Sequence, residues 1–513
     1  MGVFSGNFRL EKVFDTFGLD IPPFDKELPD LDLNLYEQIA DKLRFTKNSR
    51  RHYLRYCKNA KEIYLDALED VPAFGYINDF MFALHEKWFK HDKRDQDKVV
   101  YRPEVVLMVM LLAQMENKIS CCDVANYWLW NNALLQYLVP GMPSPEHLIS
   151  DETVRSIRCM APEKDVMAFF QEYFGHIKDD FIDLIQKYAD KQDNASKFRP
   201  TIGGDGQELR ASFRRGETSR KKKGAHGVSF VDCDTSTVIG CTTVTRKNHE
   251  VLAFTKILQN ISVADDCIFF SDALNTRDSL TLVLDEQNID YLLPLKDSLK
   301  NTPIREQFIA KFENGNTDML KQEFVSKAHG RIEQTTFSLI SADDLSLLLK
   351  AFPNIKSVLR YTKSSQRYIK DAQDNGKSSK NVIYLISTLE CNEENFEQLI
   401  HSVNVRWNYE AHHNTLDVVM LQDYRALCDQ NHLAYTVGFN KIIYNVMNYA
   451  RYRMIDDDDT NPRKAKAKPK PLSFKQAFHD MEGKPAIAMQ YLIEYFLSND
   501  SDKTLNKSIQ RYS

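Results

Sequence analysis

The chain has 513 residues, of which 43% are hydrophobic and 27% charged, and its formal net charge is −5 at pH 7. This length allows roughly two to four domains, and the composition excludes a disordered or fibrous protein. No apolar run is long enough to span a membrane, the start of the chain lacks the apolar core of a secretion signal, and nine cysteines show no zinc or disulfide spacing. We therefore expect a cytoplasmic protein that makes no contact with a membrane.

Residues 1–195 are predicted to be mostly helical. Apolar residues recur at three- and four-residue spacing in residues 33–45, 60–68, 77–89 and 103–114. Pro103 stands where proline favours the first turn of a helix, and Ser150 is a typical N-cap before a further helix. Polar residues 187–200 show no periodicity and predict a linker.

After residue 200 the hydrophobic period changes from about 3.6 to 2, which is typical of strands. The expected order is strands at 202–206, 226–232 and 237–245, a helix at 250–259, a strand at 267–270, a helix at 277–287 and a strand at 291–295. This is the element order of a ribonuclease-H-like α/β core. The apolar residues 268–270 fit a central parallel strand that is buried on both faces. Residues 196–300 are thus predicted to form the first part of this core.

The rest of the chain is predicted to interrupt and then complete the core. Residues 301–390 form a β-rich insertion, with strands at 323–326, 335–340, 357–361 and 382–387 and a mobile loop at 363–380. Residues 391–455 form the completing helices, at 393–420 and 435–452. Residues 456–513 contain an aspartate run, a basic linker and a C-terminal helix at 486–497.

Two aspartates stand at predicted strand ends. Asp205 lies in a glycine-rich strand end, and Asp272 directly follows the apolar strand. Ligands bind at such ends in open α/β sheets, and converging carboxylates favour a hard cation such as Mg²⁺ or Mn²⁺. Glu410 is the candidate third acid, one helical turn after Arg406, and two ions held by such a trio can assist phosphoryl displacement. Because acidic residues are common, with 72 in the chain, an ordinary structural role stays open, and Glu333 is an alternative third acid.

Two basic clusters stand out in this acidic chain. Residues 214–223 carry six basic residues against one glutamate, and residues 463–470 carry five with no acid. Either cluster could contact DNA phosphates, with affinity that falls as salt rises, or could form a solvated loop. The candidate DNA-contacting residues of the first cluster are Arg214, Arg215, Lys221, Lys222 and Lys223.

Eight short stretches occur in an order that is typical of one family. They are MPSPEHLISDETVRSI (142–157), IGGDGQELRAS (202–212), HGVSFVDCDTSTVIGCTTVTRKNHE (226–250), IFFSDALNTR (268–277), DYLLPLK (290–296), HGRIE (329–333), YLISTL (384–389) and RWNYEAHHNTLDV (406–418). Together they resemble the H-repeat-associated transposases, a branch of the DDE-type bacterial insertion-sequence transposases.

The resemblance implies a set of site residues. Asp205, Asp272 and Glu410 match the catalytic, metal-binding triad, with Mg²⁺ or Mn²⁺, expected as two ions, as cofactor. Arg406 matches an arginine that precedes the glutamate by four residues, whereas Val403 and Asp417 replace the tyrosine and lysine of the broader superfamily. The DNA-binding residues implied are Arg406, Lys296, His329 and Arg331, although Arg331 could equally be a salt-bridged strand residue.

The resemblance also implies an activity. It indicates a DNA transposase that hydrolyses phosphodiester bonds at transposon ends and transfers the strand into target DNA. A homodimer on double-stranded DNA, in a bacterial cytoplasm and associated with the nucleoid, is expected, with residues 1–195 recognising the DNA ends. Two alternatives stay open: an inactive, domesticated DNA-binding descendant, and a metal-dependent nuclease without strand transfer.

Overall fold

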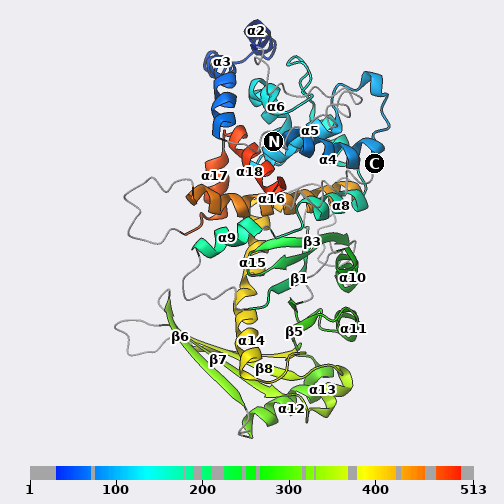
Figure 1. Ribbon diagram of the computed structural model, residues 1–513, viewed down its shortest axis with the longest axis vertical. Helices are drawn as coiled ribbons and strands as arrows, with labels where there is room; N and C mark the ends of the chain where they lie inside the picture. The colour runs from blue at the N-terminus through cyan, green and yellow to red at the C-terminus, as the bar shows by residue number, and fades with distance from the viewer. Residues whose placement is uncertain are drawn as a thin grey trace, which may run out of the picture.

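The computed structural model describes residues 30–70, 76–177, 179–188, 198–209, 225–244, 250–260, 266–314, 319–328, 331–367, 378–422, 429–456 and 470–497. In these ranges the molecule is elongated. Helices from both ends of the sequence gather at one end, and a sheet extends from them to the other (Figure 1).

Nine strands form one continuous mixed sheet among the described residues, in the order β3-β2-β1-β4-β5-β9-β8-β7-β6. Their bounds are β1 Thr201–Glu208, β2 His226–Asp232, β3 Thr237–Val244, β4 Ile268–Ser271, β5 Asp290–Pro294, β6 Leu320–Ala328, β7 Arg331–Ser341, β8 Ser357–Arg367 and β9 Ser378–Ser387. β1 pairs antiparallel with β2 and parallel with β4, which is in turn parallel to β5. The antiparallel pairing of β5 with β9 joins the first five strands to the last four. The predicted mixture of helices and strands in an α/β chain is therefore confirmed.

The helices pack against this sheet and against one another. Their bounds are α2 Leu33–Lys42, α3 Lys47–Asp70, α4 Ile77–Trp88, α5 Pro103–Met115, α6 Cys121–Leu138, α7 Asp151–Arg158, α8 Glu163–Tyr173, α9 Asp179–Tyr188, α10 Glu250–Asn260, α11 Asp278–Glu286, α12 Thr302–Glu313, α13 Ser346–Ala351, α14 Glu393–Val405, α15 Trp407–Asn414, α16 Gln430–Asp456, α17 Phe474–Met481 and α18 Pro485–Leu497. No helix in the described part of the chain is both long and apolar enough to cross a membrane.

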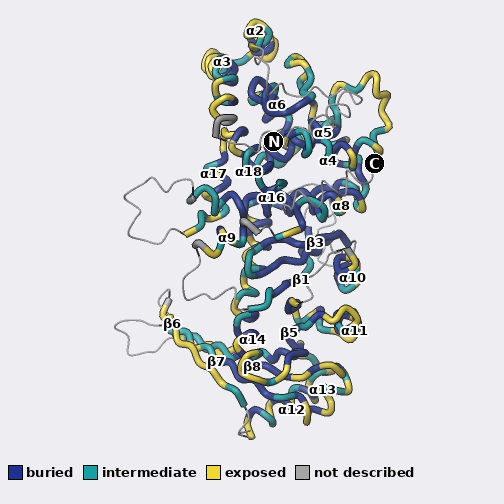
Figure 2. The backbone as a smooth tube through the Cα atoms, in the orientation of Figure 1, coloured by how far each residue is buried: buried dark blue, intermediate teal, exposed yellow. Residues whose placement is uncertain are grey.

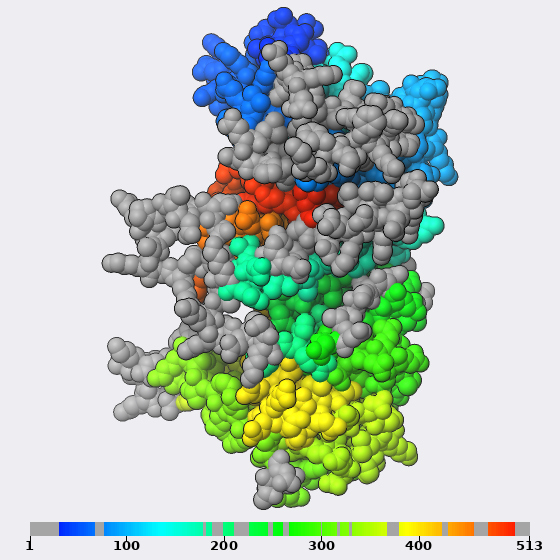
Figure 3. All heavy atoms as spheres, in the orientation of Figure 1, coloured from blue at the N-terminus to red at the C-terminus, as the bar shows by residue number. Residues whose placement is uncertain are grey.

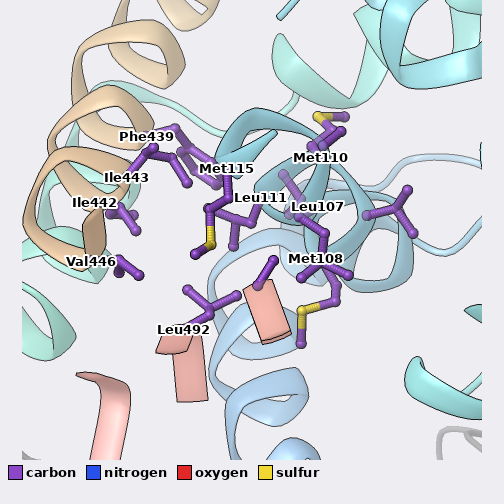
Figure 4. Close-up of a cluster of buried hydrophobic side chains, with 14 of the residues drawn as sticks. Leu107, Met108, Met110, Leu111, Met115, Phe439, Ile442, Ile443, Val446 and Leu492 are labelled. Atoms are coloured by element: carbon purple, nitrogen blue, oxygen red, sulfur yellow. The ribbon is translucent and has the colours of Figure 1, made fainter. Parts of the chain in front are cut away.

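The largest hydrophobic core joins helices from the two ends of the sequence. Helix α5 is buried along its whole length and packs against α16 and α18, whose side chains Phe439, Ile443 and Leu492 lie around Leu111 (Figure 4). α16 also packs against β3, so it connects this helical body to the sheet. Buried Asn445 of α16 strengthens that connection, because its amide bonds both the N–H and the carbonyl of Val238 at 2.8 Å.

Most predicted elements between residues 202 and 295 are present within a few residues of their expected bounds. The predicted loop at 363–380 is wrong at both ends, because β8 continues to Arg367 and β9 already begins at Ser378. These polar strand ends are held by backbone pairing between neighbouring strands rather than by burial. The outer strands β6 to β8 are accordingly exposed where the centre of the sheet is buried (Figure 2).

Two predicted helices also differ from the structure. The single helix expected at 393–420 is divided at Arg406 into α14 and α15, where the Tyr409 N–H bonds to the Arg406 carbonyl at 3.0 Å and tightens the turn. A π-helical turn, Thr415–Val419, follows α15. Near the start of the chain, α3 begins at Lys47 rather than near residue 60. The prediction missed its first half because that half is polar on all but one narrow side.

Candidate active site

Strands β1 and β4 bring two of the predicted acids to one edge of the sheet. Gly204 of β1 lies opposite Ser271, the last residue of β4, in parallel register; Asp205 is the next residue of β1, and Asp272 directly follows β4. Parallel neighbours in register present their side chains to the same face of a sheet. Asp205, the fifth of the eight residues of β1, therefore lies beside Asp272, the residue after β4, where the parallel pairing of the two strands ends. Asp205 was expected at a strand end, but β1 continues beyond it to Glu208.

Helix α15 covers the face toward which Asp205 points. A Cβ at Gly203, two residues before Asp205, would lie 2.7 Å from Cδ2 of Tyr409. Two residues after Asp205, Gln207 donates from Nε2 to the Asp417 carboxylate at 2.6 Å. Since alternate residues of a strand share a face, Asp205 lies between these two contacts and faces the helix that carries Glu410.

The aromatic ring of Tyr409 is buried beside Asp205. Burial raises the pKa of Tyr409 well above its ordinary value, and the negative charge of Asp205 adds to this effect. Gly203 is thus required for close approach, because any side chain there would separate β1 from α15.

Arg406 interacts electrostatically with both Glu410 and Asp272. Its guanidinium lies over the ring of Phe270 at 5.3 Å and over that of Trp407 at 4.6 Å. Burial lowers the pKa of Arg406, while the negative charges of Glu410 and Asp272 oppose the shift. Arg406 Nε is buried without a hydrogen-bond partner among the described residues, so a donor is left available at this position.

Each aspartate carboxylate accepts a hydrogen bond from the backbone N–H of the next residue. Oδ1 of Asp205 accepts the Gly206 N–H at 2.8 Å, and Oδ1 of Asp272 accepts the Ala273 N–H at 2.6 Å. Asp272 and Glu410 are exposed. Within the described ranges, no three His, Cys, Asp or Glu side chains are grouped closely enough to hold a metal ion. Asp205 and Asp272 thus lie on neighbouring strands with Glu410 on the covering helix, and the three do not form a compact cage.

A buried polar contact, which the sequence did not predict, joins α15 to α16. Nε2 of His412 lies 3.0 Å from Nζ of Lys441 on α16, and both residues are fully enclosed. Burial lowers the pKa of Lys441 to about 7 and that of His412 well below its ordinary value. The adjacent histidines of the RWNYEAHHNTLDV stretch were the available signal, since two histidines at this position in a helix are unusual for a solvated face.

The other predicted residues lie in different places. Lys296 is exposed just after β5, which neighbours β4, and so lies at the same edge of the sheet as Asp272. Arg331 is exposed at the start of β7 and forms no ion pair with a described residue. Glu333, the alternative third acid, pairs with Lys363 at 2.9 Å on β8, and four described strands separate β7 from β1. His329, Arg214, Arg215, Lys221, Lys222, Lys223 and most of the basic residues at 463–470 lie outside the described residues.

Comparison with known proteins gives two curated relatives. The chain is 24% identical over 363 residues to the "H repeat-associated putative transposase YhhI" and to the "Putative protein YbfL", both of Escherichia coli (strain K12). Each alignment covers 69% of this chain and 87% of the relative. The resemblance to H-repeat-associated proteins is confirmed. It extends over most of the chain rather than over a single motif.

The remaining comparisons concern family models and solved structures. No family model matches the sequence. Among solved structures, the chain is similar to a piggyBac transposase in a synaptic complex with hairpin DNA, with 11% identity, a TM-score of 0.34, and coverage of 80% of this chain and 78% of the other.

Proposed function

We propose that the protein is a DNA transposase whose catalytic carboxylates are Asp205, Asp272 and Glu410. The observation that carries this proposal is the parallel register of β1 and β4, which sets Asp205 beside Asp272 under the helix that bears Glu410. The similarity to a relative that is named a transposase supports the choice of reaction. The order β3-β2-β1-β4-β5, antiparallel and then parallel, supports a ribonuclease-H-like core.

The carboxylate oxygens of the three acids match the ligand preference of Mg²⁺ or Mn²⁺, hard cations that retain water, although the three groups do not form a compact cage in the free protein. Two such ions, when bound, would activate the attacking oxygen and stabilise the leaving one. The Gly206 and Ala273 N–H groups orient one oxygen of each aspartate.

Arg406 has a separate role in this proposal. Its charge offsets the repulsion between Glu410 and Asp272 in the free protein, and its side chain, which ends in a guanidinium donor, is only half-buried. A phosphate oxygen of DNA is a fitting acceptor for such a donor, since guanidinium groups bind phosphates with directed hydrogen bonds. Arg406 would therefore hold the DNA backbone beside the acids, and exposed Lys296 would add positive charge at the same edge.

Double-stranded DNA is the proposed partner, as transposon end and as target. Because two ends must be cut and joined together, we propose that the protein acts as a homodimer on DNA. The mass of the complex with a short end duplex tests this: a complex of two chains with two duplexes is expected, and a complex of a single chain with a single duplex at saturation would contradict it.

The decisive experiment is cleavage of a duplex that carries the DNA flanking the gene. Wild type should cut it in Mg²⁺ and not in EDTA. Asp272→Asn, which keeps shape and loses charge, should reduce the cleavage rate by about 100-fold or more, as expected for several kcal/mol of lost transition-state stabilisation. Asp278→Asn, a matched change at an exposed aspartate of α11, should cleave like wild type.

The alternatives give different results. If wild type and Asp272→Asn behave alike in Mg²⁺, the enzymatic proposal is wrong, and binding of the ends without cleavage would indicate the inactive descendant. Joining of a pre-cut 3′ end into a plasmid distinguishes a transposase from a nuclease that lacks strand transfer.

A further inference from the structure

Helix α3 and the turn before it carry a strong positive charge in a chain that is acidic overall. Residues 42–61 contain eight Lys or Arg residues and no Asp or Glu. Arg50 pairs with Asp41 at 2.9 Å and Lys61 with Asp30 at 2.8 Å, which neutralises two of them. The other six are exposed and make no ion pair with any residue that the structure describes: Lys42, Arg44, Lys47, Arg51, Arg55 and Lys58.

Four of these cations share one side of α3. With about 100° between successive residues of a helix, Lys47, Arg51, Arg55 and Lys58 fall within an arc of about 80°. The opposite side is buried against α6, through Tyr53, Cys57, Ala60 and Tyr64. The basic face is therefore fixed outward by the packing of the helix rather than by the preferences of the charged side chains.

The order of charges along α3 is unfavourable for the helix itself. Cations are stabilised near the C-terminal end of a helix and acids near the N-terminal end, because of the helix dipole. In α3 the first half is basic, whereas Glu62, Asp66 and Asp70 lie in the second half. Helix stability does not explain this distribution, but a ligand that is negatively charged does.

The turn between α2 and α3 adds another cation in a constrained position. Arg44 has a φ of 53°, in the left-handed region where glycine or asparagine is favoured at the end of a helix. Phe45 holds the turn in place, since its ring stacks on Trp130 at 5.0 Å and meets Tyr53 edge-on at 5.4 Å. Arg44 is thereby presented beside the basic face of α3, at the end of the molecule where α2 and α3 lie at the surface (Figure 3).

We propose that this basic face of α3, extended by Arg44, binds the phosphate backbone of duplex DNA. From Lys47 to Lys58 it extends about 16 Å along the helix axis, at about 1.5 Å per residue. Duplex DNA carries one charge per about 1.7 Å of its length, so several phosphates lie within reach of this face. An anionic membrane fits less well, because the apolar side of α3 is buried against α6 and is unable to enter a bilayer.

The inference rests on the proposed function in its choice of DNA as the polyanion, and it assigns to α3 contacts with the backbone rather than with base edges. Backbone contacts carry no sequence information but fix the position of the protein on the duplex. The α3 face would then hold DNA at the end of the molecule where the helices gather, while the carboxylates act on it at the sheet.

The test measures binding without chemistry. Full-length protein is titrated in EDTA against a labelled random-sequence duplex of about 30 base pairs, and the binding constant is measured by anisotropy over a series of salt concentrations. The α3 variant replaces the four cations of the arc by alanine, which favours the helix: Lys47→Ala, Arg51→Ala, Arg55→Ala and Lys58→Ala. A control variant removes the same charge from four exposed lysines elsewhere: Lys93→Ala, Lys350→Ala, Lys475→Ala and Lys484→Ala.

Four phosphate contacts contribute about 3.6 to the slope of log K against log salt, at about 0.9 per contact. We expect the slope of the α3 variant to be smaller by this amount and its binding to be weaker at every salt concentration. The slope of the control should differ from that of wild type by no more than the contribution of one contact, about 0.9. An equal loss in both variants, or no loss in the α3 variant, overturns the proposal. Tighter binding of wild type to phosphatidylserine vesicles than to DNA also overturns it.

The outcome is independent of the catalytic test. Loss of binding in the α3 variant can occur even if Asp272→Asn has no effect on cleavage, and in that case only the proposed catalysis fails. Conversely, full DNA binding by the α3 variant together with acid-dependent cleavage refutes the role of α3 alone.

Discussion

The contact between β1 and α15 gives a sharp prediction, because a single glycine sets the distance. In Gly203→Ala the new Cβ would lie 2.7 Å from Cδ2 of Tyr409 and 3.0 Å from Sγ of Cys233. Ordinary carbon contacts are near 3.5–4.0 Å, so the strand and helix must separate by about 1 Å. Such overpacking costs about 1–3 kcal/mol of folding stability. Since Tyr409 precedes Glu410, the displacement also moves Glu410 away from Asp205.

A matched variant on the same strand separates the two effects. In Gly204→Ala the Cβ would lie 2.6 Å from Cζ of Phe269 and 3.0 Å from Cε1 of Phe230, on the face of β1 away from α15. Both variants should therefore lose similar stability. Only Gly203→Ala should also lose about 10- to 100-fold in cleavage rate, because a shift of about 1 Å at a catalytic group can cost that much.

Two assays decide the matter. Urea unfolding measures the stability of each variant, and single-turnover cleavage in Mg²⁺, under conditions where each variant is folded, measures the rate. If Gly203→Ala is destabilised and still cleaves at the wild-type rate, the position of α15 does not control the reaction. If Gly204→Ala loses as much rate as Gly203→Ala, the loss reflects general destabilisation and the reasoning is refuted.

Two further predictions concern buried polar groups on α16. Lys441 loses its proton near pH 7 in the folded protein and near 10.5 when unfolded, so the unfolded state binds more protons between these values and stability rises with pH across that window. Lys441→Met should reduce the slope of unfolding free energy against pH, measured by urea unfolding, by up to about 1.4 kcal/mol per pH unit, and an unchanged slope would contradict the buried position. Asn445→Ala removes bonds to Val238 and to the Phe174 carbonyl and should cost about 2–5 kcal/mol in the same assay, whereas Asn404→Ala, at an exposed site on α14, should cost less than about 0.5 kcal/mol. Equal losses in the two asparagine variants would show that the bonds to β3 do not matter.

The strands around the acids could be predicted because their sequence signals are local. The run Ile268–Phe270 is apolar, and β4 and β2 are buried along their whole length. Asp272 follows directly from the end of β4, whereas Asp205 stands inside β1, where the burial of that strand first decreases. The register that makes them neighbours is a long-range pairing, and periodicity alone does not specify it.

Other features depend on contacts that no local pattern displays. His412 and Lys441 are polar and fully buried, so a hydrophobic pattern places them at the surface of their helices. The first half of α3 was missed because its few buried residues are separated by cations, which hide the apolar stripe. The pairing of β5 with β9 was also not predicted, because strands nearly a hundred residues apart pair only when the chain between them folds back.

Helix α15 connects the two proposals. Tyr409 packs against β1, and His412, one turn further along the same side of α15, contacts Lys441 of α16. α16 lies in the hydrophobic core that also contains the buried residues of α3, so the same body supports the basic face and Glu410. Backbone binding and strand cleavage should nevertheless be separable. Substitutions at His412 or Lys441 change the packing of α15 against α16 and should therefore slow cleavage. They should leave the salt dependence of DNA binding unchanged, because neither residue lies on α3.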